Sequence, residues 1–594
     1  MCPGHICGVL PHLKRTLPVV RPYWHVYTAG FVCVFISAYF RTIGPTYLQR
    51  GVDALGHPGG LAALRTALLL LLAVALLGGI ARFIMRQTLN GVSRRVETDL
   101  RHRLYVHLQS LSADCHDRYS TGDLMARATN DLLAVRMVAG PGVMYLSDTL
   151  VGAVMVLPFL LHISPRLTGL ALLPLVGLPV GMTVFGQAIH RRSERIQAAF
   201  ADLTTAVHEN LSGARIVRAY QLERGEIARF RTITTEYAGR NLALAKVSGA
   251  FHPLLAMLGG LGAVAVIWLG GRLVIQNTIS VGEFVAFSTW LTLLIWPMLA
   301  LGWAVNLVQR GEASMGRINA LLDTASSIVS PPRPVPLPPA RAARELRFED
   351  VWFRYPTAPE RGWVLQHVSF AVPPGRILGI VGPTGSGKSA LAELIVRSYD
   401  PDRGRILLDG VELRSLALSD LRKAVGFVPQ ETFLFSDTLK ANVLLGAPDD
   451  GRLERIGVTS QLSAALSELP HGYKTMLGER GVNLSGGQRQ RAAIARALAQ
   501  DPPVFVLDDA LSAVDAQTET RILRGLRDAL STRTRVIISH RLSAVREADW
   551  ILVLEGGRVV EEGTHSELMA RRQRYWELLR RQEAEAELEE VATR

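Results

Sequence analysis

Six stretches in the first half of the chain are almost entirely apolar, and each is about as long as the roughly 20 residues that a helix needs to cross a bilayer. They cover residues 23–47, 61–84, 142–163, 167–189, 250–271 and 281–308. Soluble helices of this length keep a polar face, and these stretches do not. The pattern therefore predicts six membrane-spanning helices rather than a buried bundle in a soluble protein.

The segments between these stretches differ in length. Residues 85–141 and 190–249 form two long connections, whereas the other connections are short. The long connections have periodic apolar positions and many charges, which is typical of helix. We expect each of them to extend two membrane helices out of the bilayer as a helical hairpin.

Basic residues indicate which side of the membrane these connections face. Eight arginines lie in 85–141, and nine arginines with Lys246 lie in 190–249. Because basic loops stay in the cytoplasm, both long connections and the N-terminus should be cytoplasmic. We expect a multi-pass protein of the cell's inner (plasma) membrane, whose C-terminal half is cytoplasmic.

Three charged residues fall within the predicted spans. Arg41, Asp148 and Glu283 all lie near predicted span ends. A charge inside a membrane often marks a functional site, but long side chains near an interface usually reach the aqueous edge. We expect the second behaviour here and assign none of the three to a substrate.

Composition narrows the possible partners. The net charge of +13 first suggests nucleic acid, but its arginines gather in the hydrophilic segments between apolar stretches, so no nucleic-acid partner is expected. The cysteines have neither disulfide nor metal spacing: they are Cys2, Cys7, Cys33 and Cys115. No convincing signal peptide precedes the first apolar stretch.

The chain divides by composition into five parts. Residues 330–340 hold six prolines, which predicts an extended linker rather than a helix. The predicted parts are an N-terminal cytoplasmic segment (1–22), a transmembrane domain (23–322), the proline-rich linker (323–344), a globular domain (345–580) and an acidic tail (581–594).

The globular domain contains a phosphate-binding loop. Residues 382–389 read GPTGSGKS, after the apolar strand pattern of 377–381 and before a helix-like stretch. The glycines allow backbone N–H groups to surround phosphates at a helix N-terminus. Lys388 supplies a positive charge to the β- and γ-phosphates, and Ser389 supplies a hydroxyl to Mg²⁺.

A second motif follows about 120 residues later in the chain. Residues 503–509 read PVFVLDD, a buried-strand pattern that ends in carboxylates. In P-loop ATPases such a strand holds the Mg²⁺ shell through its aspartate, here Asp508. The two motifs together predict ATP and Mg²⁺ as cofactors.

Between these motifs lies the sequence LSGGQ at residues 484–488. Ser485 is expected to cap a helix whose N-terminus faces a phosphate. With this sequence in that position, the chain resembles the ATP-binding cassette (ABC) transporter family. The resemblance implies a dimer in which Ser485–Gln488 contact ATP held by the P-loop of the second nucleotide-binding domain.

Further positions match the family in the same order. Tyr355 matches the aromatic residue that stacks on adenine, and Gln430 matches the glutamine that contacts Mg²⁺ and the membrane domain. Residues 512–515 (SAVD) resemble the D-loop, and His540 matches the switch histidine near the γ-phosphate. In the long connections, 121–131 and 212–220 resemble the segments that couple exporter membrane domains to nucleotide-binding domains.

The resemblance implies a fold and a set of site residues. The fold is an all-α six-helix transmembrane exporter domain followed by an α/β P-loop nucleotide-binding domain. The expected catalytic residues are Asp509, His540 and Gln430, and the expected Mg²⁺ ligands, partly through water, are Ser389, Gln430 and Asp508. The expected nucleotide-binding residues are Tyr355, Gly382, Pro383, Thr384, Gly385, Ser386, Gly387, Lys388, Ser389, Ala390, Asp508, Ser485, Gly486, Gly487 and Gln488.

Asp509 departs from the pattern of active sites in this family. They carry glutamate after the Mg²⁺-binding aspartate, to polarise the attacking water. Aspartate is one methylene shorter, and a displacement of about 1 Å can cost on the order of 10²-fold in rate. With LSGGQ intact, the chain resembles the degenerate subunit of heterodimeric exporters, paired with a half-transporter that carries the glutamate. A homodimer with a slower aspartate is the alternative.

These features predict ATP-driven export of hydrophobic or amphipathic compounds by alternating access, with the bilayer and a second half-transporter as partners. Lipid or peptide translocation and import of a chelated metal remain open, as does an ATP-gated channel or regulator. A soluble ABC ATPase acting on DNA or ribosomes conflicts with the six apolar spans.

Overall fold

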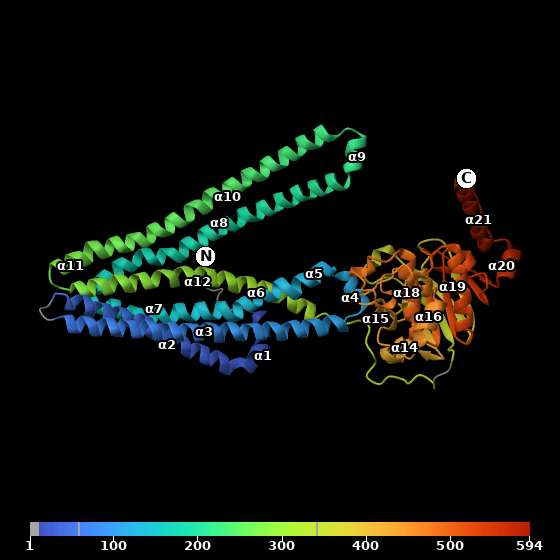
Figure 1. The fold of residues 1–594 in the computed structure, drawn as a ribbon, viewed down its shortest axis with the longest axis horizontal. Helices are drawn as coiled ribbons and strands as arrows, with labels where there is room; N and C mark the ends of the chain where they lie inside the picture. Colours follow the sequence, from blue (N-terminus) through green and yellow to red (C-terminus); the bar gives the residue numbers. More distant parts are fainter. Residues whose placement is uncertain (1–10, 57–59, 340–341, 594) are drawn as a thin grey trace. The chain divides into compact units, whose positions relative to one another are not determined.

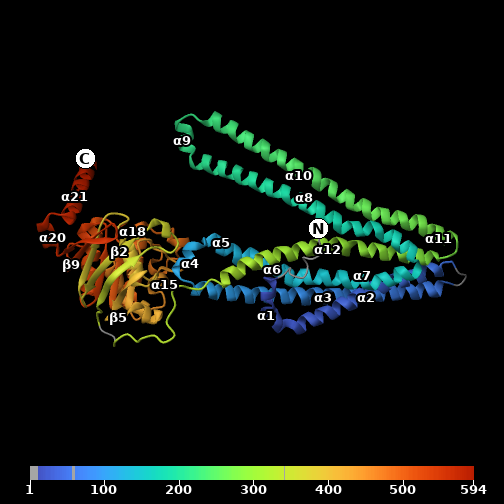
Figure 2. The ribbon, with the colours of Figure 1, turned by 180° about the vertical axis from the view of Figure 1, so that it is seen from behind.

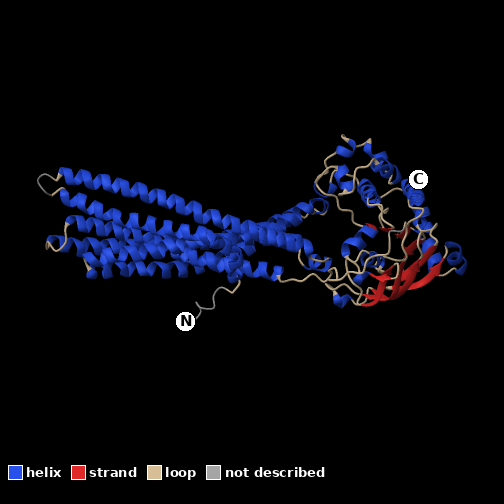
Figure 3. Ribbon diagram, turned by 90° about the horizontal axis from the view of Figure 1, so that it is seen from below, coloured by secondary structure: helices blue, strands red, loops and turns tan. Residues whose placement is uncertain are grey.

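The computed structural model describes residues 11–56, 60–339 and 342–593, which divide into two compact units (Figure 1). Residues 1–109 and 122–323 belong to one unit, here called the helical unit. Residues 110–121 and 324–594 belong to the other, the sheet unit. All described strands lie in the sheet unit, as the red arrows in Figure 3 show.

The helical unit is built from six long helices. They are α2 (Trp24–Ala54), α3 (Leu61–Ser110), α7 (Val143–Ile163), α8 (Pro165–Ser212), α10 (Glu223–Ala265) and α12 (Val281–Leu322). After α10 the chain continues through a π-helical turn, Val266–Gly270, into α11 (Gly271–Ile275). Each predicted membrane span lies within one of these helical stretches, except that residues 23 and 142 come one position before α2 and α7.

Five helical stretches of the described chain are long and apolar enough to cross a membrane. They contain the predicted spans 23–47, 61–84, 142–163, 250–271 and 281–308. The remaining span, 167–189, lies in α8, where several side chains between 175 and 183 fall outside the described residues. That span stays a prediction.

The two long connections are helical, as expected. Helices α8 and α10 run side by side as an antiparallel pair, joined through the short α9 (Ala214–Ala219), which Figures 1 and 2 both show. The first connection is broken into shorter pieces. These are the end of α3, α4 (Ala113–Arg118), α5 (Thr121–Ala126) and α6 (Leu132–Met137).

Helix α12 packs against α2, α7 and α8. The apolar cluster among α7, α8 and α12 includes the buried side chains of Leu160, Leu167, Phe287 and Trp290. Small residues allow close approach between helices in membranes. Gly311 of α12 illustrates this, because a Cβ there would lie 2.2 Å from the side chain of Val138.

The expectation that the charged residues of the spans reach the aqueous edge is wrong for Arg41 and Asp148. Arg41 of α2 and Asp148 of α7 form a two-pronged ion pair, with N–O distances of 3.0 and 3.1 Å. The Arg41 side chain is only 16% exposed. The two helices pack together, so each charge finds its partner within the unit. Glu283 instead caps the start of α12, where its carboxylate accepts a hydrogen bond from the Ser280 N–H.

The sheet unit contains two β-sheets. The larger has the strand order β10-β9-β3-β8-β7-β6, parallel except for β10, and the smaller is antiparallel with the order β2-β1-β4-β5. The strands are β1 (Leu346–Phe353), β2 (Leu365–Val372), β3 (Ile377–Val381), β4 (Arg403–Leu408), β5 (Val411–Glu412), β6 (Val425–Val428), β7 (Val504–Asp508), β8 (Thr534–Ile538), β9 (Trp550–Glu555) and β10 (Arg558–Gly563). The parallel strands are nearly continuous apolar runs, because helices cover both faces of such sheets.

Nine helices of the described sheet unit surround these sheets, in addition to α4. They are α13 (Lys388–Ile395), α14 (Leu418–Ala424), α15 (Leu439–Leu444), α16 (Arg452–Thr459), α17 (Leu462–Leu466), α18 (Gly486–Ala499), α19 (Ala516–Ala529), α20 (His565–Arg571) and α21 (Arg574–Thr593). The predicted α/β class of this unit and the all-α class of the helical unit are confirmed.

The predicted proline-rich linker, 323–344, contains no helix or strand over its described residues, 323–339 and 342–344. It runs along the sheet unit, because the Val335 N–H donates to the Ser415 carbonyl at 2.8 Å and the Leu418 N–H donates to Ser330 Oγ at 3.0 Å. The predicted acidic tail begins inside α21, and its side chains from residue 585 onward fall outside the described residues.

Candidate nucleotide-binding site

Four neighbouring parallel strands end at one edge of the larger sheet. Strand β3 ends at Val381, β8 at Ile538, β7 at Asp508 and β6 at Val428, and Ile538 pairs with both Ile380 and Asp508. Loops at this edge of parallel sheets form the ligand sites of α/β folds. The P-loop, Asp508, Asp509, His540 and Gln430 all lie at the ends of these strands or within two residues of them, so the topology gathers them at one edge.

The P-loop lies between β3 and α13, as its sequence context predicted. Gly387 caps α13 with φ of 99°. A Cβ on Gly387 would lie 2.8 Å from the Val364 carbonyl oxygen, and one on Gly382 would lie 2.1 Å from that of Leu554. Only glycine fits at these two positions, because any side chain would clash with the neighbouring backbone. The glycines therefore allow the loop to take the conformation in which its N–H groups can face a phosphate.

Lys388 is almost completely buried at the first position of α13. Its ammonium group donates to the carbonyl oxygens of Gly382 at 2.9 Å and Pro383 at 2.8 Å. Burial lowers the pKa of Lys388, whereas the nearby carboxylates of Asp509 and Asp508 raise it. Because the hydrogen-bond partners of this ammonium group are neutral carbonyl oxygens, its charge is still available to bind an anionic ligand.

Ser389 and Asp508 join the P-loop to the end of β7. The Ser389 hydroxyl donates to Asp508 Oδ1 at 3.2 Å. Burial raises the pKa of Asp508, and the Ser389 hydrogen bond opposes that shift. Two cis oxygen ligands of an octahedral Mg²⁺ ion lie roughly 3 Å apart, so this oxygen pair fits the ion. Mg²⁺ held there would neutralise phosphate charge.

Asp509 directly follows β7 in a left-handed conformation, with φ of 45°. Its N–H donates to the Ile538 carbonyl at 2.9 Å, and its Oδ1 accepts the His540 N–H at 3.3 Å. The carboxylate is thus buried against the backbone of the loop that carries His540. This geometry ties Asp509 to the loop after β8.

The pKa of His540 is lowered by burial and by the positive charge of Lys388, and it is raised by Asp509. The imidazole is therefore neutral near pH 7. A neutral ring can donate one hydrogen bond and accept another, which suits a residue placed beside a phosphate and its attacking water.

The loop that carries His540 is held by Arg541, Glu519 and Gln582, and the sequence pattern indicated none of these three. Arg541 donates to the carbonyls of Ser512, at 3.1 Å, and Val514, at 3.0 Å, and it forms an ion pair with Glu519 of α19. These contacts join the loop to the predicted D-loop.

On the other side of the loop, Gln582 of α21 accepts the Leu542 N–H at 3.1 Å and donates to the His540 carbonyl. The partners are 40 or more residues apart in the chain, so no local pattern signals them.

Tyr355 follows β1 of the smaller sheet, and Gln430 follows β6 of the larger sheet. The Tyr355 hydroxyl donates to Glu393 of α13 at 2.8 Å, and its ring meets that of Tyr399 edge-on. Burial and Glu393 raise the pKa of Tyr355. Gln430 lies two residues beyond β6 with its side chain exposed. Their roles in adenine stacking and Mg²⁺ binding stay predictions.

The signature sequence starts α18, and Ser485 caps this helix, as predicted. Ser485 Oγ accepts the Gln488 N–H, and the Gln488 side chain accepts the Ser485 N–H. Gln490 of the same helix bonds both Ser512 and Ala513, each at 3.0 Å. The signature and the predicted D-loop are therefore held together as one surface, and α18 packs in a different apolar cluster from the P-loop helix.

The first long connection contributes α4 to the sheet unit. The side chain of Ala113 packs on the core between the two sheets, and Tyr399 donates a hydrogen bond to Asp117. The predicted coupling segment, 121–131, belongs to the helical unit from residue 122 onward, and there Asp131 pairs with Arg317 of α12. The piece that packs on the sheets lies one segment earlier than the sequence had suggested.

Comparison with known proteins agrees with this architecture. Residues 27–298 match the ABC transporter transmembrane region, and residues 365–512 match the ABC transporter family model. The chain is 37% identical over 579 residues to a probable multidrug resistance ABC transporter ATP-binding/permease protein, YheI, of Bacillus subtilis, covering 96% of this chain and 97% of that protein. It is 36% identical to the multidrug resistance-like ATP-binding protein MdlA of Escherichia coli, covering 96% of each.

A solved structure of a bacterial Atm1-family ABC exporter with ATP bound superposes with a TM-score of 0.76 at 26% identity, covering 95% of this chain and 99% of that one. A helical membrane unit joined to a P-loop ATPase unit defines an ATP-driven transporter. The chain belongs to the ABC transporter family, as a half-transporter of the exporter type. It is a membrane protein with a cytoplasmic ATP-binding unit, and its site binds ATP for transport.

Proposed function

We propose that this chain is the degenerate-site half of a heterodimeric exporter of hydrophobic or amphipathic compounds. The observation that carries the proposal is Asp509, in the position where a competent site needs a longer carboxylate. The chain would bind Mg-ATP with Lys388, Ser389 and Asp508 and hydrolyse it slowly.

The surroundings of Asp509 support slow hydrolysis at this site. Its carboxylate is 8% exposed, and one oxygen is engaged by the His540 N–H at 3.3 Å. A side chain one methylene shorter than glutamate and tied to the backbone cannot reach as far toward an attacking water. A misplacement of about 1 Å is expected to lower the rate on the order of 10²-fold.

The signature surface supports a role in a partner's site. Ser485–Gln488 forms a complete capping box, and Gln488 also donates to Glu468 at 2.6 Å. Because the cap and the glycines at this helix N-terminus are intact, the surface can face a phosphate. In a head-to-tail pair, this chain would complete the site that hydrolyses ATP rapidly on the other polypeptide.

The names of the two relatives, which describe multidrug resistance and multidrug resistance-like proteins, support drug-like cargo. The large apolar surface of the helical unit also suits cargo that enters from the bilayer. Lipid or peptide translocation is the second candidate, and import of a chelated metal is the third.

ATP turnover of the chain alone and with its partner tests the pairing. We expect the purified chain in nanodiscs to bind ATP but to hydrolyse it slowly, and the partner half-transporter to restore fast turnover. Asp509→Glu should raise single-chain turnover on the order of 10-fold or more, and Asp509→Asn, which keeps the size and removes the charge, should not. Full drug-stimulated turnover by the chain alone would overturn the heterodimer in favour of a homodimer.

Cargo is tested separately, with the assembled pair in inside-out vesicles. ATP-dependent accumulation of a fluorescent cationic dye, but not of a labelled phospholipid or peptide, would support drug-like cargo. The reverse pattern would favour lipid or peptide translocation, and loss of vesicle-loaded chelated metal would favour import.

A further inference from the structure

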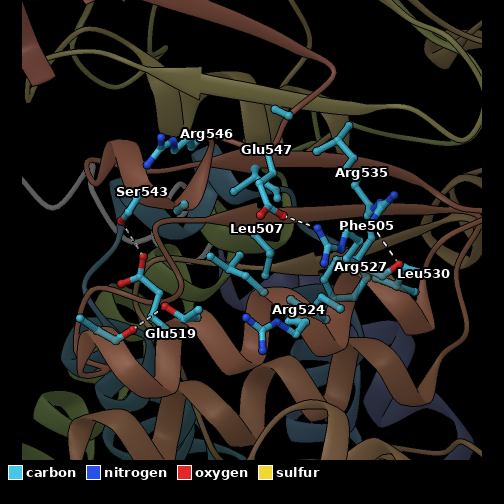
Figure 4. A pocket seen from close by; sticks show the side chains of 18 residues that line it. Phe505, Leu507, Glu519, Arg524, Arg527, Leu530, Arg535, Ser543, Arg546 and Glu547 are labelled. Atoms are coloured by element: carbon cyan, nitrogen blue, oxygen red, sulfur yellow. Dashed lines mark hydrogen bonds and ion pairs between the residues drawn. The ribbon is translucent and has the colours of Figure 1, made fainter. Parts of the chain in front are cut away.

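The sheet unit contains a cavity whose lining is separate from the predicted nucleotide-binding residues. It lies between α19, strands β7 and β8 and the segment 543–548, and its volume is about 240 Å³ (Figure 4). None of the predicted nucleotide-binding residues lines it. Ligand sites for drug-sized molecules have volumes of roughly 300–1,000 Å³, so this cavity suits a smaller molecule.

One side of the cavity is apolar. Phe505 and Leu507 of β7 and Leu526 of α19 line it together with Leu530, and all four are buried. An aromatic ring or a short aliphatic chain placed against them would lose its contact with water, which favours binding.

The charged part of the lining consists of four arginines and two glutamates. Arg527 pairs with Glu547 at 2.5 Å, which Figure 4 shows as a dashed line. The other lining carboxylate, Glu519, is already held by Arg541 and by the Ser543 hydroxyl. Both acidic groups of the lining are therefore committed to other partners.

Three lining arginines are left without a carboxylate partner among the described residues. They are Arg524 of α19, Arg535 of β8 and Arg546. Figure 4 labels these three arginines, which come from α19, β8 and the segment 543–548 around the same space. Three guanidinium groups around one small cavity produce a positive potential that attracts an anion.

Arg535 gives the strongest indication. It is only 7% exposed, and its Nε atom is buried without a hydrogen-bond partner. Its one hydrogen bond within the described chain joins Nη1 to the Arg527 carbonyl at 3.5 Å. The nearby carboxylate of Asp549 already accepts bonds from Arg376 and from the Ile377 N–H.

Burial lowers the pKa of Arg535, Asp549 opposes this, and Arg527 adds to it. A buried guanidinium with an unmade hydrogen bond is costly, and an anionic acceptor would satisfy it.

We propose that this cavity is a binding site for a small organic anion, a carboxylate or phosphate attached to an apolar body, separate from the nucleotide site. The apolar body lies on Phe505, Leu507 and Leu526, and the anionic group is bound by Arg524, Arg535 and Arg546. The proposal does not depend on the heterodimer, because it is measured as binding to this chain.

Calorimetric titration of the full chain in zwitterionic nanodiscs tests the site. A non-hydrolysable ATP analogue occupies the P-loop, and empty nanodiscs provide the blank. The probes are 3-phenylpropanoate, the neutral 3-phenylpropanol, 3-phenylpropylammonium and inorganic phosphate. We expect 3-phenylpropanoate to bind at least about tenfold more tightly than each of the others, because hydrogen bonds to charged groups are the strong ones.

Matched variants locate the binding. Arg524→Gln and Arg546→Gln should each weaken 3-phenylpropanoate binding about tenfold. Arg521→Gln removes the same charge from the same helix, outside the cavity lining, and should leave binding unchanged. Thermal midpoints within about 2 °C of the parent will show that the variants fold.

Arg535→Met separates a ligand-binding role from a structural one. If Arg535 is present for a ligand, this variant loses 3-phenylpropanoate binding while the ligand-free protein is as stable as the parent or more so. Equal binding of the three phenylpropyl probes, inorganic phosphate binding as tightly as 3-phenylpropanoate, or binding that Arg524→Gln and Arg546→Gln leave intact would each overturn the proposal.

Discussion

The helical unit and the sheet unit both bury charged side chains, but they satisfy these charges in different ways. In the helical unit, Arg41 and Asp148 neutralise each other directly, with two N–O contacts of 3.0 and 3.1 Å. In the sheet unit, the buried Lys388 is held by neutral carbonyl oxygens, and the buried Asp508 is held by a neutral hydroxyl. The Arg41–Asp148 pair is neutral as a whole, whereas Lys388 and Asp508 keep charges that a ligand can use.

This difference separates a charge that supports structure from a charge that supports binding. A bidentate ion pair between two packed helices is self-contained, so its removal should affect folding rather than ligand affinity. A cation held by neutral groups has the opposite property, because its strongest interaction is still to be made with phosphate. Arg535 of the cavity lining belongs to the second kind, because its buried Nε atom has no hydrogen-bond partner.

The largest expected effect comes from breaking the pair in the helical unit. Arg41→Leu leaves Asp148 as an uncompensated charge and should lower the free energy of unfolding by about 3 to 5 kcal/mol. Equilibrium unfolding in mixed micelles measures this loss. The double variant Arg41→Leu/Asp148→Leu should recover most of it, and a double variant as unstable as the single one would contradict mutual neutralisation.

Lys388→Ala provides the contrasting change in the sheet unit. It should weaken ATP binding on the order of 10²-fold, because a charge-assisted contact to phosphate is lost. Its thermal midpoint should stay close to that of the parent. Fluorescent-nucleotide titration gives the affinity, and Lys423→Ala, on an exposed position of α14, is the matched control. A large stability loss with unchanged affinity would break the comparison.

Buried hydrogen bonds in the helical unit should have a smaller effect than its ion pair. The Trp290 indole N–H donates to the Thr42 carbonyl at 2.8 Å inside the unit. Trp290→Phe should therefore lower the free energy of unfolding by about 1 kcal/mol. Trp296→Phe in the same helix, at a position that is 67% exposed, should leave it unchanged. Equal losses in both variants would mean that the hydrogen bond contributes nothing.

Features encoded by local pattern were predictable from the sequence. Five spans coincide with helices because twenty apolar residues in a row allow few other structures. The P-loop and the Ser485 cap follow from short motifs with fixed geometry. The gathering of the motifs at one sheet edge needs the strand order, which only the fold supplies.

Features that depend on distant pairing were not predictable. Arg41 and Asp148 are 107 residues apart, and Gln582 lies 42 residues beyond His540. Neither partner carries a local signal, because one arginine or glutamine looks like any other until the chain folds. The segment that packs on the sheets was misplaced for the same reason: α4 is too short to show a period.

The two hydrogen bonds from Gln582 to the His540 loop offer a finer test in the sheet unit. Gln582→Leu removes both and should speed amide hydrogen exchange at Leu542 about threefold to tenfold, because the bond that the Leu542 N–H loses contributes about 1 kcal/mol. Gln582→Glu keeps the acceptor for the Leu542 N–H and should show the smaller change. Unchanged exchange in Gln582→Leu would show that Arg541 alone holds the loop.

The smallest expected effect is a pH dependence that follows from the charges around His540. Burial and Lys388 lower the pKa of His540 below its ordinary value of 6.5. As the pH falls through 6.5, the unfolded chain takes up a proton that the folded chain does not, so the folded state loses stability with acid.

The thermal midpoint of the parent should therefore fall more between about pH 7.5 and pH 5.5 than that of His540→Gln, which cannot take up this proton. Lys388→Ala should reduce the difference, because it removes the cation that keeps the imidazole neutral. The double variant Arg41→Leu/Asp148→Leu removes both charged groups of the helical-unit pair, so it should leave the pH dependence as it is. If this double variant and Lys388→Ala change the pH dependence equally, charge in the two units is not handled differently.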